Sequence, residues 1–309
     1  IEPSGEARAV TVGARKLVDI LRALPEGAEV TLQQQDKRLL LKASKSRFTL
    51  QTLPAEDFPR LAKPAGEVAR FSLPERALKR LLGLVQYAMA QQDIRYYLNG
   101  LLMVVEDRTL KLVATDGHRL AFASMALDAQ LPHQEVIVPR KSVVELTKLL
   151  SEGDAEVRIE LSATQAAFAF GTVELVSKLV DGKFPDYTRV IPVGHKNRLL
   201  IDREMLRQAL SRAAILSNEK FRGVRWVLTD GSLKIISSNT EQEEAEETLE
   251  VGYSGDALDI GFNVNYLLDV LNNVAGGEVE CRFGDAASSA LLSFPSEAEF
   301  KYVVMPMRI

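Results

Sequence analysis

The sequence is poor in the residues that most often do chemistry. One cysteine among 309 residues cannot form a disulfide within the chain, and a single thiol fits a reducing compartment. Only three histidines are present, and no glycine-rich loop could cradle a phosphate, so the sequence offers no catalytic constellation. We therefore expect a protein that is not an enzyme and uses no cofactor and no metal.

Long apolar runs are missing as well. No run approaches the roughly 20 residues needed to span a bilayer, and the sequence has no signal-peptide pattern. With 46% hydrophobic and 26% charged residues, the composition is ordinary for a soluble globular protein. We expect a cytoplasmic protein that makes no contact with a membrane.

Positive charge is not in excess either. The formal net charge of -4 gives no bulk attraction to nucleic acid. A nucleic-acid partner would therefore require that the cations gather on one surface.

Three stretches of the chain repeat one pattern. Residues 10–32 (VTVGARKLVDILRALPEGAEVTL) align with residues 136–159 (VIVPRKSVVELTKLLSEGDAEVRI), and residues 262–281 (FNVNYLLDVLNNVAGGEVEC) are a third version. A long fixed period indicates a duplicated unit, so we predict three copies of one module. Cys281 aligns with apolar residues of the other copies, which predicts a buried side chain and not a nucleophile.

The repeat predicts domains 1–64, 65–193 and 194–309, with linkers near residues 62–70 and 193–198. The first copy aligns only with the second half of the others, so we expect roughly 55 to 65 further residues at the front of the natural protein. Each full copy should contain two helices and about eight short antiparallel strands, which is an α+β fold.

Local signals place the helices and turns. We expect a helix from Arg15 that ends at Pro25, a helix from Pro74 to about Gln91, and a helix capped by Asp202. Residues 93–124 should form three strands, with turns at residues 106–107 and 115–117.

Several stretches carry a specific resemblance. They include QQDIRYYLNG (91–100), ATDGHRLA (114–121), SKLVDGKFPDYTRV (177–190), AAILSNEKFRGVR (213–225) and YVVMPMR (302–308). Together they resemble the bacterial DNA polymerase III beta subunit, the replicative sliding clamp, along the whole chain. The resemblance implies three clamp modules with antiparallel sheets outside and helices that line a ring. It also implies a head-to-tail homodimer that encircles double-stranded DNA without reading its sequence.

The resemblance implies partners too. A clamp tethers the replicative polymerase to DNA and so confers processivity. The expected partners are the DNA polymerase III alpha subunit, the clamp loader, and other polymerases and repair proteins, each of which binds through a short peptide motif.

Cations recur on equivalent helices in every copy. On one helix alone such charges are ordinarily a solvated face, but their recurrence favours contacts with phosphates, which are independent of sequence and sensitive to salt. The resemblance adds a loop whose tyrosines would stack on unpaired bases or, alternatively, pack on a sheet. The predicted DNA-binding residues are Arg15, Arg22, Lys79, Arg80, Gln92, Arg95, Tyr96, Tyr97, Arg140, Lys141, Arg207 and Arg212.

The resemblance also joins three separated segments into a groove for partner peptides. Met, Val and Pro side chains would give the groove an apolar and adaptable floor. The alternative is an interdomain seam that binds no ligand. The predicted groove residues are Leu98, Thr115, Gly117, His118, Arg119, Leu120, Pro185, Arg189, Val190, Asn263, Tyr266, Val303, Val304, Met305, Pro306, Met307 and Arg308.

A dimer interface is implied between the last module of one subunit and the first module of the other. Apolar contacts would be flanked by acidic residues facing basic ones. The predicted residues are Lys16, Lys45, Arg47, Phe48, Leu50, Ile215, Leu216, Glu243, Glu244 and Glu246.

Two other functions stay open at this point. The first is a nuclease whose site is built from the acidic run EQEEAEE (241–247), although this run lacks the spacing of a calcium loop. The second is a peptide-binding scaffold that does not bind DNA.

Overall fold

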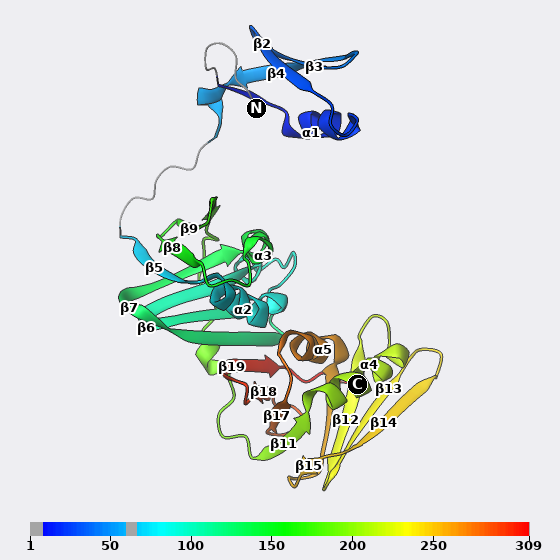
Figure 1. Cartoon of the computed structure of the whole chain (residues 1–309). Coiled ribbons are helices and arrows are strands. Elements are labelled where there is room, and N and C mark those ends of the chain that lie inside the picture. The colour runs from blue at the N-terminus through cyan, green and yellow to red at the C-terminus, as the bar shows by residue number, and fades with distance from the viewer. Residues whose placement is uncertain (1–8, 60–66, 309) are drawn as a thin grey trace. The chain divides into compact units, whose positions relative to one another are not determined.

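The computed structural model describes residues 9–59 and 67–308, which belong to two compact units. Unit 1 comprises residues 1–63 and unit 2 comprises residues 64–309 (Figure 1). Most of the predicted linker at residues 62–70 lies outside the described residues, and described residues 69 and 70 begin a strand of unit 2.

Unit 1 is one helix with a four-stranded antiparallel sheet of order β1-β4-β3-β2. The helix predicted at Arg15 begins one residue earlier and ends before Pro25, as expected. Its elements are β1 (Val10–Val12), α1 (Ala14–Ala23), β2 (Val30–Gln35), β3 (Arg38–Ala43), β4 (Ser46–Pro54) and the 3₁₀ turn η1 (Ala55–Asp57).

The first part of unit 2 runs to residue 193 and is called the central part below. It holds two α-helices among six strands in the described residues. The elements are β5 (Ala69–Pro74), α2 (Glu75–Val85), η2 (Gln86–Ala88), η3 (Tyr96–Leu98), β6 (Gly100–Thr115), β7 (Arg119–Pro139), α3 (Arg140–Leu149), β8 (Glu156–Leu161), β9 (Gln165–Phe170), β10 (Val173–Lys178) and η4 (Tyr187–Arg189).

The C-terminal part of unit 2 begins at residue 194 and repeats the theme with two α-helices and nine strands in its described residues. The elements are β11 (Asn197–Asp202), α4 (Arg203–Ala213), η5 (Ala214–Leu216), β12 (Gly223–Thr229), β13 (Ser232–Ser238), β14 (Glu244–Glu250), β15 (Gly252–Tyr253), β16 (Leu258–Asn263), α5 (Val264–Asn273), β17 (Glu278–Phe283), β18 (Ala290–Phe294) and β19 (Glu297–Val304).

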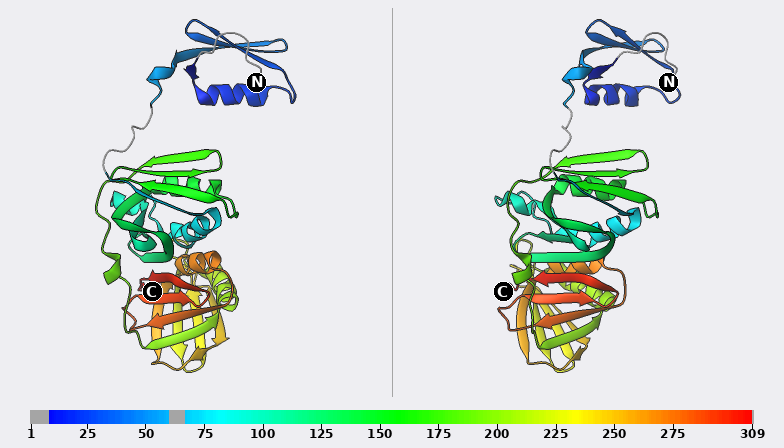
Figure 2. Two further views of the ribbon diagram at one scale, coloured as in Figure 1. Left: turned by 60° about the vertical axis from the view of Figure 1, so that its left-hand side comes forward. Right: turned by 90° about the vertical axis from the view of Figure 1, so that its left-hand side faces the viewer.

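The two parts of unit 2 share a sheet. Its seven strands have the order β15-β11-β17-β18-β19-β7-β6, so the central part supplies β6 and β7 and the C-terminal part supplies the rest (Figure 2). The seam is the antiparallel pair β19–β7, in which Val303 lies opposite Leu120 and Tyr302 opposite Ala121. Two four-stranded sheets complete the unit, β10-β9-β8-β5 and β14-β13-β12-β16.

The sequence pattern explains why these elements form. Alternate residues of β5 and β9 are buried, as expected for strands with one face on a core. The predicted apolar stripe of α2, with Leu78, Leu82 and Val85, is fully buried. Asp202 caps α4 by accepting a hydrogen bond from the backbone N–H of Met205 at 2.8 Å, as predicted.

One hydrophobic core extends through both parts of unit 2. Trp226 is 1% exposed, and its ring meets Phe262 edge-on with centroids 5.5 Å apart. Cys281 is completely buried in this core, which confirms the prediction from the repeat. None of the helices in the described ranges has the length and apolar character that crossing a membrane requires.

Two local predictions in the central part were wrong. The helix expected to reach Gln91 ends at Val85 and tightens into η2. Ala88, Met89 and Ala90 are all buried, so the one-sided apolar pattern that sustains a surface helix is lost there. The backbone N–H of Ala90 then donates to the carbonyl of Leu98 at 3.0 Å and closes a loop.

The turn expected at residues 106–107 is absent, because β6 continues through it. Asp107 has a positive φ of 51° and forms an irregularity, while β6 stays paired with β7 on both sides of it. The strands predicted to be separate are therefore fused, and the central part has six strands where about eight were expected. The turn at residues 115–117 is confirmed.

Candidate functional site

The TDGHRL turn (Thr115–Leu120) connects β6 to β7 and is held by its own side chains. The carboxylate of Asp116 accepts hydrogen bonds from the backbone N–H groups of His118 at 2.9 Å and Arg119 at 3.1 Å. The hydroxyl of Thr115 accepts from Gly117 at 3.1 Å and donates to the carbonyl of Arg119 at 2.6 Å. The turn therefore has a defined shape before any partner binds.

Arg119 fastens the turn to the C-terminal part. Its guanidinium donates to Asp116 at 3.0 Å, to Asp269 of α5 at 2.6 Å and to the carbonyl of Tyr87 at 2.6 Å. It also lies over the ring of Tyr266, 4.5 Å from the centroid. Only 9% of the side chain is exposed. Arg119 thus acts mainly as an internal clasp.

The electrostatics of the clasp favour the charged guanidinium. Burial alone would lower the pKa of Arg119, but Tyr302 and the hydrogen-bonded carboxylate of Asp269 outweigh it and raise the pKa. Burial in turn raises the pKa of Tyr302.

Predicted groove residues of three segments pack together in the interior. Leu98, Leu120 and Val303 are each at most 2% exposed and pack with Phe184 in a second core cluster. Val304 is buried in the main core instead, because neighbours along a strand face opposite sides.

The tail (Met305–Arg308) follows β19 and is attached at two points. The backbone N–H of Met305 donates to the carbonyl of His118 at 2.9 Å, and that of Met307 donates to Gly261 of β16 at 2.9 Å. The side chain of Met305 is 46% exposed. The tail therefore bridges the TDGHRL turn and the C-terminal part, with Pro306 and Met307 half-buried and Arg308 exposed.

The remaining predicted groove residues are near the surface. Arg189 is the last residue of η4, with Pro185 before the turn and Val190 directly after it. Arg189 pairs with Asp186 at 2.9 Å, and Val190 is 42% exposed. Asn263 caps α5, since its side-chain oxygen accepts from the N–H of Asn265 at 2.9 Å. Tyr266 lies one turn further along α5 and is half-buried.

Two hollows adjoin these residues. One, of about 300 Å³, is lined by Met89, Ala90, Gln91, Asp93, Asp116, His118, Arg119 and Tyr266. The other, of about 250 Å³, is lined by Asn218, Phe221, Gly223, Ser238, Met307 and Arg308. The turn thus lines one surface depression and the end of the tail lines the other.

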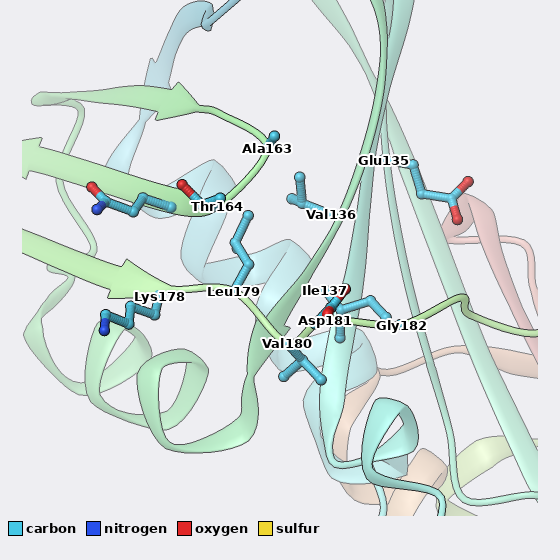
Figure 3. Close-up of a pocket in the computed structure, with 11 residues that line it drawn as sticks. Glu135, Val136, Ile137, Ala163, Thr164, Lys178, Leu179, Val180, Asp181 and Gly182 are labelled. Atoms are coloured by element: carbon cyan, nitrogen blue, oxygen red, sulfur yellow. The ribbon is translucent and has the colours of Figure 1, made fainter. Parts of the chain in front are cut away.

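A third cavity of about 600 Å³ lies elsewhere in the central part, between β7, the β8–β9 turn and the segment after β10 (Figure 3). Glu135, Lys178 and Asp181 line it together with several apolar side chains. None of its lining residues is a predicted groove residue, so size alone does not identify the candidate site.

The predicted DNA-binding cations of unit 2 are mostly paired within the chain. Lys79 pairs with Glu152 at 2.8 Å, Arg207 with Glu204 at 2.5 Å and Arg212 with Glu247 at 2.6 Å. Hydrogen bonds from Arg207 lower the pKa of Glu204 to about 2, so that carboxylate stays ionised. These cations lie at the surface, and each is paired with a carboxylate of the same chain.

The other predicted cations differ in their surroundings. Arg80 of α2 pairs with Glu297 and donates to the carbonyl of Asn273 at 3.0 Å, which links the two parts of unit 2. Arg140 donates to the carbonyl of Met89 at 3.2 Å, whereas Lys141 is exposed. In unit 1, Arg15 and Arg22 are exposed on α1.

The predicted tyrosine loop spans Gln91–Asn99. Gln92 has a positive φ of 56°, and Asn99 exchanges two hydrogen bonds with the backbone of Asp93, at 2.9 and 2.8 Å. Tyr96 is 58% exposed and meets the half-buried Tyr97 edge-on. The loop offers one tyrosine to solvent while the other packs inward.

The predicted interface residues lie on exposed edges of both units. In unit 1, Lys16 of α1 and Lys45 and Arg47 beside or within β4 are exposed, with Phe48 and Leu50 half-buried. In unit 2, Ile215 of η5 is 76% exposed, and Leu216 beside it is half-buried.

The predicted acidic interface residues of unit 2 lie on β14 and in the turn before it. Glu243 accepts from the amide of Asn239 at 2.6 Å, Glu246 pairs with Lys234 at 2.9 Å, and Glu244 is exposed. Within residues 9–59 and 67–308, no His, Cys, Asp and Glu side chains form a group that could hold a metal ion.

Sequence reasoning missed the residues that connect the site. Asp269 and Tyr87 hold Arg119, yet they lie far from it in the chain and in no recognisable motif. Asn99 and Asp93 brace the tyrosine loop through contacts that a one-dimensional pattern does not reveal. The turn predicted at residues 115–117 does contain Asp116, whose carboxylate shapes it.

Comparisons with known proteins agree in all three domains. The chain matches the family models of the DNA polymerase III beta subunit: the N-terminal domain over residues 1–62, the central domain over residues 72–186 and the C-terminal domain over residues 188–308. It is 50% identical to the beta sliding clamp of Pseudomonas aeruginosa over 312 aligned positions, which cover all of this chain and 84% of that protein.

Solved structures give the same answer. The crystal structure of the DNA polymerase III subunit beta from Pseudomonas aeruginosa matches with a TM-score of 0.92 at 49% identity, covering 100% of this chain and 85% of that one. A clamp from the same organism bound to griselimycin matches with a TM-score of 0.88 at 50% identity, covering 97% of this chain and 81% of that one. With this level of identity along the whole sequence, the chain belongs to the DNA polymerase III beta subunit family, the bacterial beta sliding clamps.

Proposed function

We propose that this beta clamp holds its partners through a single groove made by the TDGHRL turn, the segment around η4, the start of α5 and the tail. The function of the family is to act as a sliding clamp, a non-catalytic ring on DNA that confers processivity. The clamp's partners would be the DNA polymerase III alpha subunit, the clamp loader, and other polymerases and repair proteins.

The observation that carries the proposal is the attachment of the tail. Met305 and Met307 are bound by their backbone N–H groups to different segments, and the side chain of Met305 is 46% exposed. An extended peptide with apolar anchors would bury them against Met305 and Val190. Few anchors fit in so short a groove, so affinity should be about micromolar, which suits the exchange of partners.

DNA would be held topologically and not by strong contacts. We infer that two chains close head to tail, with α4, η5 and β14 of one subunit against unit 1 of the other. Because most candidate cations are already paired, each would contribute little to DNA affinity at physiological salt. Such weak contacts suit a protein that slides in the cytoplasm of a bacterium.

The test of the ring uses DNA topology. The natural protein, loaded on nicked circular DNA, should stay bound through a high-salt wash and should be lost once the circle is linearised. Equal loss from both forms would contradict the ring.

The test of the groove uses the tail. Deleting residues 305–309 should raise the Kd of a fluorescent hexapeptide containing Leu and Gln by at least about tenfold, because it removes one wall. Arg225→Ala is the matched control, since Arg225 pairs with Asp259 on the β12–β16 surface, outside the groove. An unchanged Kd for the deletion would refute the groove, and unfolding of the deletion variant would show that the tail is core.

A further inference from the structure

Arg95 connects the Gln91–Asn99 loop to the TDGHRL turn. Its guanidinium donates to both carboxylate oxygens of Asp93, from Nε at 3.0 Å and from Nη2 at 2.8 Å. Nη2 also donates to the backbone carbonyl of Asp116 at 3.2 Å. The side chain is nevertheless 45% exposed. Arg95 therefore joins two segments and remains open to a ligand from solvent.

Gly117 makes room for this contact. Its φ of +90° suits glycine, and a Cβ atom there would lie 2.9 Å from both Nη1 and Nη2 of Arg95. Any side chain at this position would push the guanidinium away from the turn. The backbone of the turn is thus shaped to receive Arg95.

The contact reaches the tail through two residues. The carboxylate of Asp116 fixes the backbone N–H of His118, and the carbonyl of His118 accepts the N–H of Met305 at 2.9 Å. A shift of the Asp116 backbone therefore moves the carbonyl of His118, to which the N–H of Met305 is hydrogen-bonded.

Arg95 also lies where DNA is expected. Its neighbours Ile94 and Tyr96 are 97% and 58% exposed, while Asp93 and Asn99 brace the loop behind them. A phosphate is an anion, so its hydrogen bond with the guanidinium joins two ionised groups and is stronger than the bond to a neutral carbonyl. Asp93 accepts two hydrogen bonds from the guanidinium, at 3.0 and 2.8 Å, whereas the carbonyl of Asp116 accepts a single longer one at 3.2 Å. The bond to Asp116 is then the one that a phosphate displaces.

We propose that Arg95 is a positioning residue that couples DNA contact at the Gln91–Asn99 loop to the shape of the partner groove. When a phosphate binds Arg95, the guanidinium releases the carbonyl of Asp116. The hydrogen bond between the N–H of Met305 and the carbonyl of His118 then weakens, so a partner peptide binds more weakly. Linkage makes the effect reciprocal, and a bound peptide weakens the grip of Arg95 on DNA. This inference rests on the proposed function of the groove and of the loop.

The experiment measures the Kd of the fluorescent hexapeptide by anisotropy, with and without saturating duplex DNA that carries a single-stranded overhang. For the natural protein we expect DNA to raise the Kd about fivefold, which is a typical coupling between two sites. In Arg95→Lys the single ammonium cannot hold Asp93 and Asp116 together but keeps the charge. Its Kd without DNA should already be raised, and DNA should change it by less than about twofold.

Arg70→Ala is the matched control, because it removes one arginine charge from β5, where Arg70 pairs with Glu160. It should keep the fivefold response. A natural protein whose Kd ignores DNA, or an Arg95→Lys variant that responds like the natural protein, would overturn the coupling. A natural protein that binds no peptide at all would instead remove the groove and the coupling together.

A second readout needs no peptide. With ¹³C-labelled methionine methyl groups, the Met305 signal should shift when the DNA is added to the natural protein and should stay in place in Arg95→Lys. A role of Arg95 confined to loop stability would leave the Met305 signal insensitive to DNA in both proteins.

Discussion

The role of Arg119 in the fold differs from the role that its sequence motif suggests. The TDGHRL motif marks it as a groove residue, but its donors are used on Asp116, Asp269 and Tyr87 inside the chain. Its importance to the groove is therefore indirect, because it fixes the turn against α5.

Arg119→Ala should accordingly lower the free energy of unfolding. It removes the guanidinium from Asp116, which is only 17% exposed, and from the carbonyl of Tyr87, and breaking such a largely buried pair costs about 3 kcal/mol. Urea unfolding measures the loss, with Arg225→Ala as the control, since the Arg225–Asp259 pair is about half exposed and should cost less than about 1 kcal/mol. Equal losses in the two variants would contradict the clasp.

Cys281 makes a prediction about pH. Burial, with help from Glu280, raises the pKa of its thiol above the ordinary value of 9.0. The folded chain keeps the proton while the unfolded chain loses it near pH 9, so the stabilising contribution is complete below that pH and is lost above it.

The free energy of unfolding should thus fall between about pH 8 and pH 10, by about 1 kcal/mol for this one group. Cys281→Ala should start from a lower stability and decline less steeply. Urea titrations at three pH values give the two slopes. Parallel slopes would show that the thiol is not the titrating group.

At the scale of elements, the exposed end of α4 and η5 is the sharpest candidate for an interface. Ile215 is 76% exposed beside the acidic strand β14, an arrangement that fits an apolar contact with a charged rim. The surface predicted to contact Ile215 in the other subunit contains Phe48 and Leu50, which lie on β4 of unit 1.

Ile215→Asp should turn the dimer of the natural protein into monomers, because a buried charge without a partner costs several kcal/mol. Light scattering gives the mass. Val193→Asp, at a position that is 91% exposed and outside the predicted interface, should leave the dimer intact. A dimer that survives Ile215→Asp would move the interface elsewhere.

Much of the element pattern follows from the sequence. Helical spacing predicts α1 and the buried stripe of α2, and Asp202 marks the start of α4. The fused strand β6 could not be predicted, since Glu106-Asp107 is a typical turn signal and only pairing with β7 carries the strand through it. Of the candidate site, the turn and the tail are readable from motifs. The clasp joins Arg119 to Asp269, 150 positions away, and no local pattern encodes it.

For the whole molecule, the shared seven-stranded sheet decides how unit 2 behaves. The β19–β7 seam, the Arg80–Glu297 pair and a common core tie the central and C-terminal parts together. These two repeats should therefore unfold as one cooperative block, unlike domains joined only by a linker.

A comparison of two probes tests this expectation. Trp226, the only tryptophan of the chain, reports on the C-terminal part, and amide exchange in β8 and β9 reports on the central part. Both should give the same midpoint in urea. Separate midpoints would show that the seam does not couple the two parts.

The same seam limits how this protein can be recombined. Leu120 and Val303 face each other across β7 and β19, although Leu120 belongs to the central part and Val303 to the C-terminal part. A chimaera that takes one of the two parts from a distant relative would pair β7 of one protein with β19 of another, so the side chains across the seam would not be matched. Exchange of domains among clamps should therefore succeed when both seam strands come from the same parent protein. The segment to transplant as a unit is then the strand pair and not the single domain.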